Sequence, residues 1–300
     1  MRFLIRCLMV ACLVSGGASS LFAQESEVAE LRKRIELLEG EVKLLRAQLL
    51  VTQRKSPDIR ILPGEWGSGS TDDIGAVCRS TAKELWCYFP DRPAPLISVR
   101  NDKSGPMVVY GLGESGEYRV LLNTNNTYWS QYAYQFAHEM CHILCNYRDG
   151  NKDNLWFEES LCETASLFAL RRMGDSWREA APYPNWKSYA PSLSHYAQER
   201  IDSIKPPPGK TLAAWYREQE AALRKNGTDR DKNLIVAVAL LPLLEKNPEH
   251  WRALEALNQW PADDKLTFPE YLRRWHAGVD VKHKSFVADV AKLFEITLTP

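Results

Sequence analysis

The chain has 300 residues, enough for one or two domains, with 45% hydrophobic and 25% charged residues. These fractions are those of an ordinary soluble globular protein. Lysine and arginine together number 38, as do aspartate and glutamate, so the formal net charge is zero. Without a basic excess there is no long-range field to attract nucleic acid or an anionic membrane surface. We therefore expect neither of these partners.

Residues 1–23 have the pattern of a secretory signal peptide. A positively charged start, MRFLIR, precedes the apolar run CLMVACLV, and Leu21-Phe22-Ala23 offers a cleavage site before Gln24. The apolar run is too short for a membrane span. A lipoprotein signal ending before Cys12 is the alternative, but it leaves almost no apolar core upstream. We expect a secreted or periplasmic chain with no membrane span after cleavage.

Residues 27–53 carry a heptad repeat. One core position is occupied by Val28, Ile35, Val42 and Leu49, and the other by Leu31, Leu38 and Leu45. β-Branched residues at the first position with leucine at the second favour two parallel strands. Opposite charges also pair across the flanking positions, as in Glu27 with Arg32 and Glu41 with Arg46. We predict a coiled coil that makes a parallel homodimer; the alternative is a single amphipathic helix packed on its own domain.

The next segments predict a linker and then a mixture of helix and strand. Residues 54–70 contain Pro57, Pro63 and a GSGS run, which indicate a linker. A helix is expected from residue 71 to about 85. Three short runs, LISV, MVVY and YRVLL, are typical of strands. The fold class predicted is α+β.

The stretch QFAHEMCHIL, residues 135–144, has the composition of a buried helix with a metal site. His138 and His142 are four residues apart, which places both imidazoles on one helical face, where they can bind one metal ion. Glu139 follows the first histidine, where it can act as a general base. The alternative is a chance HExxH, because the motif has only three fixed letters.

A third ligand is expected on a second helix, over residues 153–174. Asp153 or Asn154 can cap its start, and Gly174 is placed to end it. The helix offers three carboxylates: Glu158, Glu159 and Glu163. Helical periodicity does not choose between Glu158 and Glu159, since both faces carry apolar neighbours.

This pair of helices resembles the gluzincin metallopeptidases, in which HExxH is followed by a second helix with a glutamate ligand. The residues that fall on the family pattern are Trp156, Phe157, Glu158, Glu159, Ser160 and Glu163, with Ser160 where the family usually has glycine. The resemblance implies one Zn²⁺ per chain held by His138, His142 and Glu159. It also implies that Glu163 orients a ligand histidine.

The resemblance further implies a zincin-like catalytic domain, which we place at residues 71–205, with a small mixed sheet beside the active-site helices. In that family the strand before the first metal helix is often a sheet edge that binds substrate backbone. Residues 117–123 therefore either receive an extended peptide or form an ordinary strand. Four residues are candidates for stabilising the transition state, although each is also explained as a packing or surface side chain: Tyr183, Tyr189, His195 and Tyr196.

Five cysteines remain after removal of the signal peptide: Cys78, Cys87, Cys141, Cys145 and Cys162. The number is odd, so at least one thiol stays free or pairs between chains. Cys141 and Cys145 share the helical face of the two histidines, and Cys162 lies on the second helix. We expect small buried residues, or one bridge between the helices, rather than zinc ligands; Cys78 with Cys87 is another possible bridge.

Residues 206–300 are predicted to be an all-α C-terminal domain that covers the catalytic domain and walls one side of its cleft. Helices are expected at 211–225, 231–246, 248–259, 268–277 and 283–295. Thr267 and Glu270 have the spacing of a capping box.

The sequence thus predicts an exported zinc metallopeptidase that hydrolyses peptide bonds of a peptide or protein substrate, with Glu139 as general base. One alternative is a non-catalytic secreted coiled-coil scaffold or binding protein that retains a zincin fold. The other is a zinc amidase that acts on cell-wall peptides with the same residues.

Overall fold

The computed structural model describes residues 30–42, 55–147, 152–204, 209–261 and 265–298. The predicted signal peptide, the alternative lipid site at Cys12, and residues 27–29 and 43–53 of the predicted coiled coil lie outside them. By internal contacts the chain divides into two units, Met1–Gln53 and Arg54–Pro300. We describe each unit by itself.

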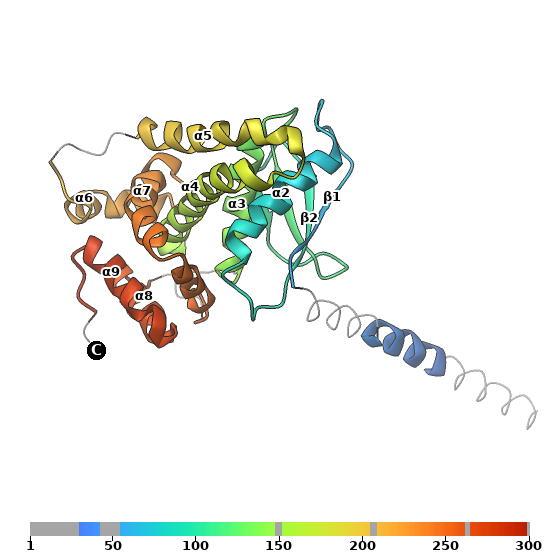
Figure 1. The fold of residues 1–300 in the computed structure, drawn as a ribbon. Helices are drawn as coiled ribbons and strands as arrows, with labels where there is room; N and C mark the ends of the chain where they lie inside the picture. The colour runs from blue at the N-terminus through green and yellow to red at the C-terminus, as the bar shows by residue number, and fades with distance from the viewer. Residues whose placement is uncertain (1–29, 43–54, 148–151, 205–208, 262–264, 299–300) are drawn as a thin grey trace, which may run out of the picture. The chain divides into compact units, whose positions relative to one another are not determined.

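In the first unit, residues 30–42 form a helix, drawn in blue in Figure 1. All thirteen residues are exposed. The apolar side chains at the heptad core positions are among them: Leu31, Ile35, Leu38 and Val42 are 45–53% exposed. The helix is present as predicted, and its assembly into a coiled coil stays a prediction.

The second unit combines a four-stranded sheet with a larger number of helices. Its strands and helices are, in chain order, β1 (Asp58–Ile61), α2 (Thr71–Trp86), β2 (Leu96–Asn101), β3 (Met107–Val109), β4 (Tyr118–Leu122), α3 (Trp129–Leu144), η1 (Lys152–Asn154), α4 (Leu155–Ala180), η2 (Pro184–Tyr189), α5 (Ala190–Ser203), α6 (Leu212–Lys225), α7 (Arg230–Lys246), η3 (Pro248–Ala256), α8 (Phe268–Gly278), η4 (Val281–His283) and α9 (Lys284–Leu293). The η elements are 3₁₀-helices. This mixture agrees with the predicted α+β class.

The sheet has the strand order β1-β2-β4-β3. β1, β2 and β4 are parallel, and β3 pairs antiparallel with β4. β1 lies within the segment 54–70 that was predicted to be a linker, and the buried Ile59 anchors it in the sheet.

Of the two alternatives for residues 117–123, the structure shows the ordinary strand and not an exposed sheet edge. The hairpin between β3 and β4 turns through Gly111 and Gly116, both at positive φ, and folds β3 back over the outer side of β4. β4 therefore has a neighbour on each side, and the edge strands of the sheet are β1 and β3.

Helix α4 is central to the second unit. It packs against α3, α5, α7 and α2 (Figure 1). It continues past Gly174, where the sequence predicted its end. A Cβ added at Gly174 would lie 2.0 Å from the Ser194 hydroxyl oxygen and 3.3 Å from the Ser194 backbone nitrogen. Glycine at this position thus permits the close approach of α5 instead of ending the helix.

The C-terminal helices share a core with the helices that carry the motif. Trp156 of α4 packs on Phe268 of α8 with ring centroids 4.6 Å apart, and Phe157 packs on Trp275. The capping box of Thr267 and Glu270 is present as predicted, whereas residues 248–256 form a 3₁₀-helix and not the predicted α-helix. By internal contacts the chain divides only after Gln53. The domain boundary predicted near residue 205 stays a prediction.

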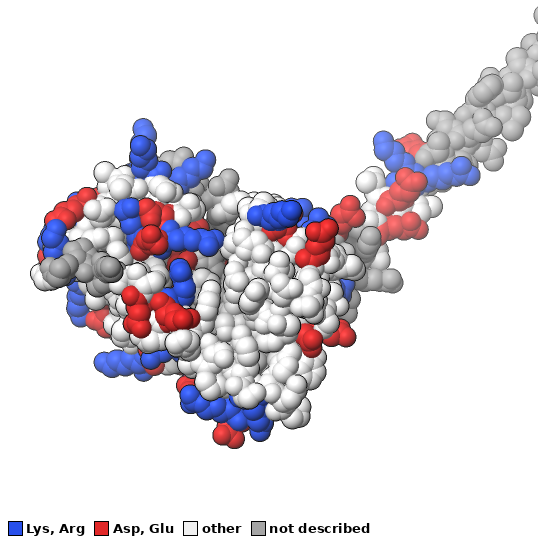
Figure 2. Space-filling view, turned by 90° about the horizontal axis from the view of Figure 1, so that it is seen from above, with Lys and Arg blue, Asp and Glu red and all other residues white. Residues whose placement is uncertain are grey.

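The surface carries charges of both signs. Figure 2 shows basic and acidic side chains interspersed on the face it presents, which agrees with the zero formal charge. Among the described residues, no helix has the length and apolar character needed to cross a membrane.

Candidate metal centre

Helix α3, which carries the HExxH motif, is held by side-chain hydrogen bonds in its middle and at its C-terminal end. In its middle, Gln135 donates to the Asn123 side chain at 2.6 Å and so ties the helix to the end of β4. At its end, the guanidinium of Arg92 donates to the carbonyl oxygens of Ile143 and Leu144, both at 2.8 Å. The last carbonyls of a helix lack the donor that the next turn would supply, and the arginine donates to two of them. The helix is therefore held at a defined position against α4.

The two motif histidines face the glutamates of α4. His138 Nε2 lies 3.1 Å from Glu159 Oε2, and His142 Nε2 lies 3.6 Å from Glu159 Oε1. On the opposite ring edges, His142 Nδ1 is 2.7 Å from Glu158 Oε1 and His138 Nδ1 is 3.8 Å from Glu163 Oε1. Each Nδ1 thus faces a carboxylate, and each Nε2 is directed to the same carboxylate, that of Glu159.

The three glutamates on α4 face the histidines differently. A histidine that donates its Nδ1–H to a carboxylate leaves the lone pair of Nε2 for a metal ion. Glu158 is within hydrogen-bond distance of His142 Nδ1, whereas Glu163 lies beyond that distance from His138 Nδ1. Glu159 is the carboxylate that lies nearest to both Nε2 atoms.

Cys162 is an alternative third ligand beside the two histidines. One ligand atom each from His138, His142 and Cys162 lie within 4.8 Å of one another, so this cluster can hold a metal ion. The Cys162 side chain is fully buried, however, whereas those of His138, His142 and Glu159 are 12–14% exposed. An open coordination position for water requires a solvent-facing side. The exposed side is the one that Glu159 borders.

The electrostatics of the cluster suit a cation. Burial acts to lower the pKa of His142, yet the hydrogen bond to Glu158 and the charge of Glu159 raise it to about 10. The pKa of His138 is also raised, because Glu159 and neighbouring carboxylates outweigh burial. Burial acts to raise the pKa of Glu159, but the two histidines lower it below its usual value. The carboxylates around the two histidines therefore favour a positive charge at this position.

Glu139 is buried beside the histidines, with 2% of its surface exposed. Burial raises its pKa, against the opposing charges of His138 and His142. The backbone of Val108 in β3 acts to lower this pKa, the smallest of the contributions. Strand β3 thus lies beside the predicted general base.

Side chains from distant parts of the chain contact Glu158 and Glu163. Asn258 donates to Glu158 Oε2 at 2.6 Å, and the Tyr271 hydroxyl donates to the Asn258 side-chain oxygen at 2.8 Å. The Tyr134 hydroxyl donates to Glu163. None of these was predicted. Tyr134 could have been found, since it precedes His138 by one helical turn, but no sequence pattern connects Asn258 or Tyr271 to the motif.

The four candidates for transition-state stabilisation lie in different surroundings. The Tyr196 ring packs edge-on against Tyr134 with centroids 5.8 Å apart. Burial raises the pKa of Tyr196, and the charge of Glu163 contributes. Tyr196 therefore lies close to the centre.

The other three make contacts elsewhere. His195 is exposed and pairs with Glu199 at 3.2 Å. The Tyr189 hydroxyl oxygen accepts from the Ser130 backbone N–H at 3.3 Å, at the start of α3. Tyr183 packs on Trp186. Of the four, Tyr196 is the one that packs on Tyr134, whose hydroxyl donates to Glu163.

Five cysteine thiols are free in the described residues. Cys141 and Cys145 of α3 and Cys162 of α4 are buried and hydrogen-bond to one another. Burial acts to raise the pKa of Cys141, but hydrogen bonds from the other two thiols lower it to about 6. Cys78 is buried in α2, and Cys87 is exposed just after it.

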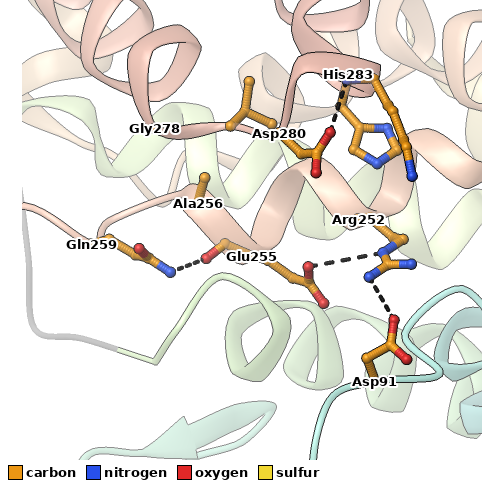
Figure 3. Close-up of a pocket in the computed structure, with 10 residues that line it drawn as sticks. Asp91, Arg252, Glu255, Ala256, Gln259, Gly278, Asp280 and His283 are labelled. Atoms are coloured by element: carbon orange, nitrogen blue, oxygen red, sulfur yellow. Dashed lines mark hydrogen bonds and ion pairs between the residues drawn. The ribbon is translucent and has the colours of Figure 1, made fainter.

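A hollow of about 270 Å³ lies between η3, the segment before α9 and the loop after α2 (Figure 3). Arg252 pairs with Asp91 across it at 3.0 Å and lies 3.9 Å from Glu255. Arg252 of η3 thus has acidic partners on both sides, one of them in the loop after α2.

No protein-family model matches the chain, and neither a curated protein nor a solved structure shows significant similarity to it.

Proposed function

We propose that the chain is an exported zinc peptidase, with one Zn²⁺ held by His138, His142 and Glu159. The observation that carries the proposal is that both Nε2 atoms face one carboxylate while each Nδ1 faces another. A bound zinc ion would lower the pKa of a water molecule and polarise a substrate carbonyl. Three protein ligands leave a position for this chemistry.

Glu139 takes the proton from the attacking water and later delivers it to the leaving amine. Its raised pKa suits a group that must both accept and donate a proton near neutral pH. Glu139 is buried beside the two histidines, and the backbone of Val108 in β3 lies next to it. An extended peptide that adds to the edge strand β3 passes beside Glu139, so β3 replaces residues 117–123 as the proposed substrate strand.

Tyr196 is the residue we propose for stabilising the transition-state oxyanion. Its contact with Tyr134, which is bonded to Glu163, places it nearer to the metal cluster than the other three candidates.

The scaffold alternative is favoured by the exposed helix at residues 30–42, which needs no catalytic site. Against it is the buried Glu139 beside the cluster, which a purely structural metal site does not require. An amidase of cell-wall peptides would use the same residues, and a panel of substrates that includes such peptides distinguishes it.

Metal analysis and peptide hydrolysis of the Glu139→Gln variant test the proposal. We expect about one zinc per chain in both proteins and a fall in hydrolysis by a factor on the order of 100 to 10,000 in the variant. Glu117→Gln, on the β3–β4 hairpin, is the matched control and should retain activity. Zinc binding without cleavage of any peptide by the wild type, including after limited proteolysis, would favour the scaffold.

A further inference from the structure

The three cysteines between α3 and α4 form a cluster that the metal site does not use. Cys141 lies in the last turn of α3, Cys145 is its C-cap residue, and Cys162 lies in α4. Each of the three thiols interacts with the other two. All three side chains are fully buried. The cluster joins the two helices that carry His138, His142 and the three glutamates, so a covalent bond within it would act directly on the metal centre.

Helix geometry decides which pair can form a disulfide. Cys145 is the C-cap residue of α3, one turn after Cys141, a spacing at which Cβ atoms are about 5–6 Å apart. A disulfide needs a Cβ–Cβ distance of about 3.5–4.5 Å. A bridge within α3 would therefore unwind the end of the helix that carries His142. Bridges to Cys162 join neighbouring side chains of two packed helices and leave both helices intact.

We propose that Cys162 forms a disulfide with one of the two α3 cysteines and that this bond clamps the metal-binding helices together. The remaining α3 thiol lies against the bridge and can exchange with it. Oxidation requires a disulfide donor such as oxidised glutathione. One protein thiolate attacks the donor and releases a thiol, and the second protein thiolate then displaces the other. The protein loses two hydrogen atoms, and the donor becomes two thiols.

The bridge has a consequence for the choice of ligand, and this part rests on the proposed function. A free Cys162 lies within 4.8 Å of a ligand atom of each histidine and can compete with Glu159 for the ion. A Cys162 sulfur in a disulfide is no longer a thiolate and is a poor zinc ligand. The oxidised chain is therefore restricted to His138, His142 and Glu159.

The test is disulfide mapping of the full chain refolded in a glutathione redox buffer. After alkylation of free thiols and digestion without reductant, we expect a cross-linked peptide that contains Cys162 and either Cys141 or Cys145. Cys162→Ala should abolish it, Cys141→Ala and Cys145→Ala should each retain a bridge, and Cys87→Ala is the matched control. The bridge closes a loop of about 20 residues, so the oxidised chain should melt roughly 5–10 °C above the reduced one.

Two results would overturn the proposal: alkylation of all three thiols in the oxidised chain, or a bridge confined to Cys141 and Cys145. If Cys162→Ala does not fold, the double variant Cys141→Ala, Cys145→Ala replaces it and should contain no bridge to Cys162. Zinc content is measured separately. A bridged chain that binds no zinc contradicts only the proposed function, and a zinc-bound chain with three free thiols contradicts only the bridge.

Discussion

At the scale of single residues, adjacent carboxylates on one helix face different atoms. Glu158 and Glu159 follow one another, so their side chains leave α4 about 100° apart. That rotation sends Glu158 to His142 Nδ1 and Glu159 to the two Nε2 atoms. Which of them is a ligand therefore depends on the rotation of α4 about its axis, which packing against α3, α5 and α7 sets.

The first prediction separates these two residues by metal content. Glu159→Ala should lose most of the zinc, because it removes a ligand. Glu158→Ala should retain zinc with an affinity about 10–100-fold weaker, the usual effect of removing a group that orients a ligand. Zinc content after dialysis against graded chelator concentrations measures both. Full zinc occupancy in Glu159→Ala with loss of zinc in Glu158→Ala would show that Glu158, and not Glu159, is the ligand.

The second prediction concerns the pH dependence of the metal-free chain. The pKa of His142 rises from its ordinary value of 6.5 to about 10 in the folded chain, so the folded state binds this proton more tightly. The resulting stability is present below pH 6.5 and is lost as the pH rises towards 10. Tm should fall over this range, and the fall should be weaker in His142→Asn and in the zinc-loaded chain, where His142 is neutral. A Tm that rises from pH 6.5 to 10 would contradict the proton linkage.

At the scale of elements, the helix at residues 30–42 differs from every helix of the second unit. Its apolar residues follow the heptad pattern, but they are exposed, with Leu31 and Ile35 both at 53%. A row of exposed leucine and isoleucine side chains is unfavourable in water and is stabilised by a partner with the same row.

The third prediction follows from that exposed row. The mature chain should be a parallel dimer at micromolar concentration, and deletion of residues 27–53 should give a monomer that keeps its zinc. Sedimentation velocity of both proteins is the measurement. Ile35→Asp should also give monomers, whereas Glu36→Ala, outside the a/d seam, should not. A monomeric wild type at micromolar concentration would contradict the predicted coiled-coil dimer.

At the scale of the whole second unit, the C-terminal helices take part in the site. Tyr271 of α8 donates to Asn258, which donates to Glu158, which faces His142. These residues span more than a hundred positions in sequence and meet through the aromatic core around Trp156 and Phe268. The sequence predicted only that the C-terminal region walls one side of a cleft. In the structure, this region also contacts a glutamate of the candidate site.

The fourth prediction tests this support from a distance. Asn258→Ala should weaken zinc binding about 10–100-fold with little change in secondary structure, because Glu158 loses the donor that holds its second oxygen. Asn247→Ala, which removes a contact of the same region with His250, is the control and should bind zinc normally. Titration with zinc in the presence of a competing chelator gives both affinities. Equal affinities would assign Asn258 a purely structural role.

The sequence by itself determined the features that depend on residues close together in the chain. Periodicity and capping residues located α2, α3, the capping box at Thr267 and the three strands after α2, because these depend on neighbours within a few positions. The spacing of His138 and His142 likewise placed both imidazoles on one face. Tertiary structure decided the rest. Gly174 continues its helix because α5 packs on it, and β3 is an edge strand because a hairpin folds it over β4. Glu158, Asn258 and Tyr271 form a chain of contacts because distant helices share one core.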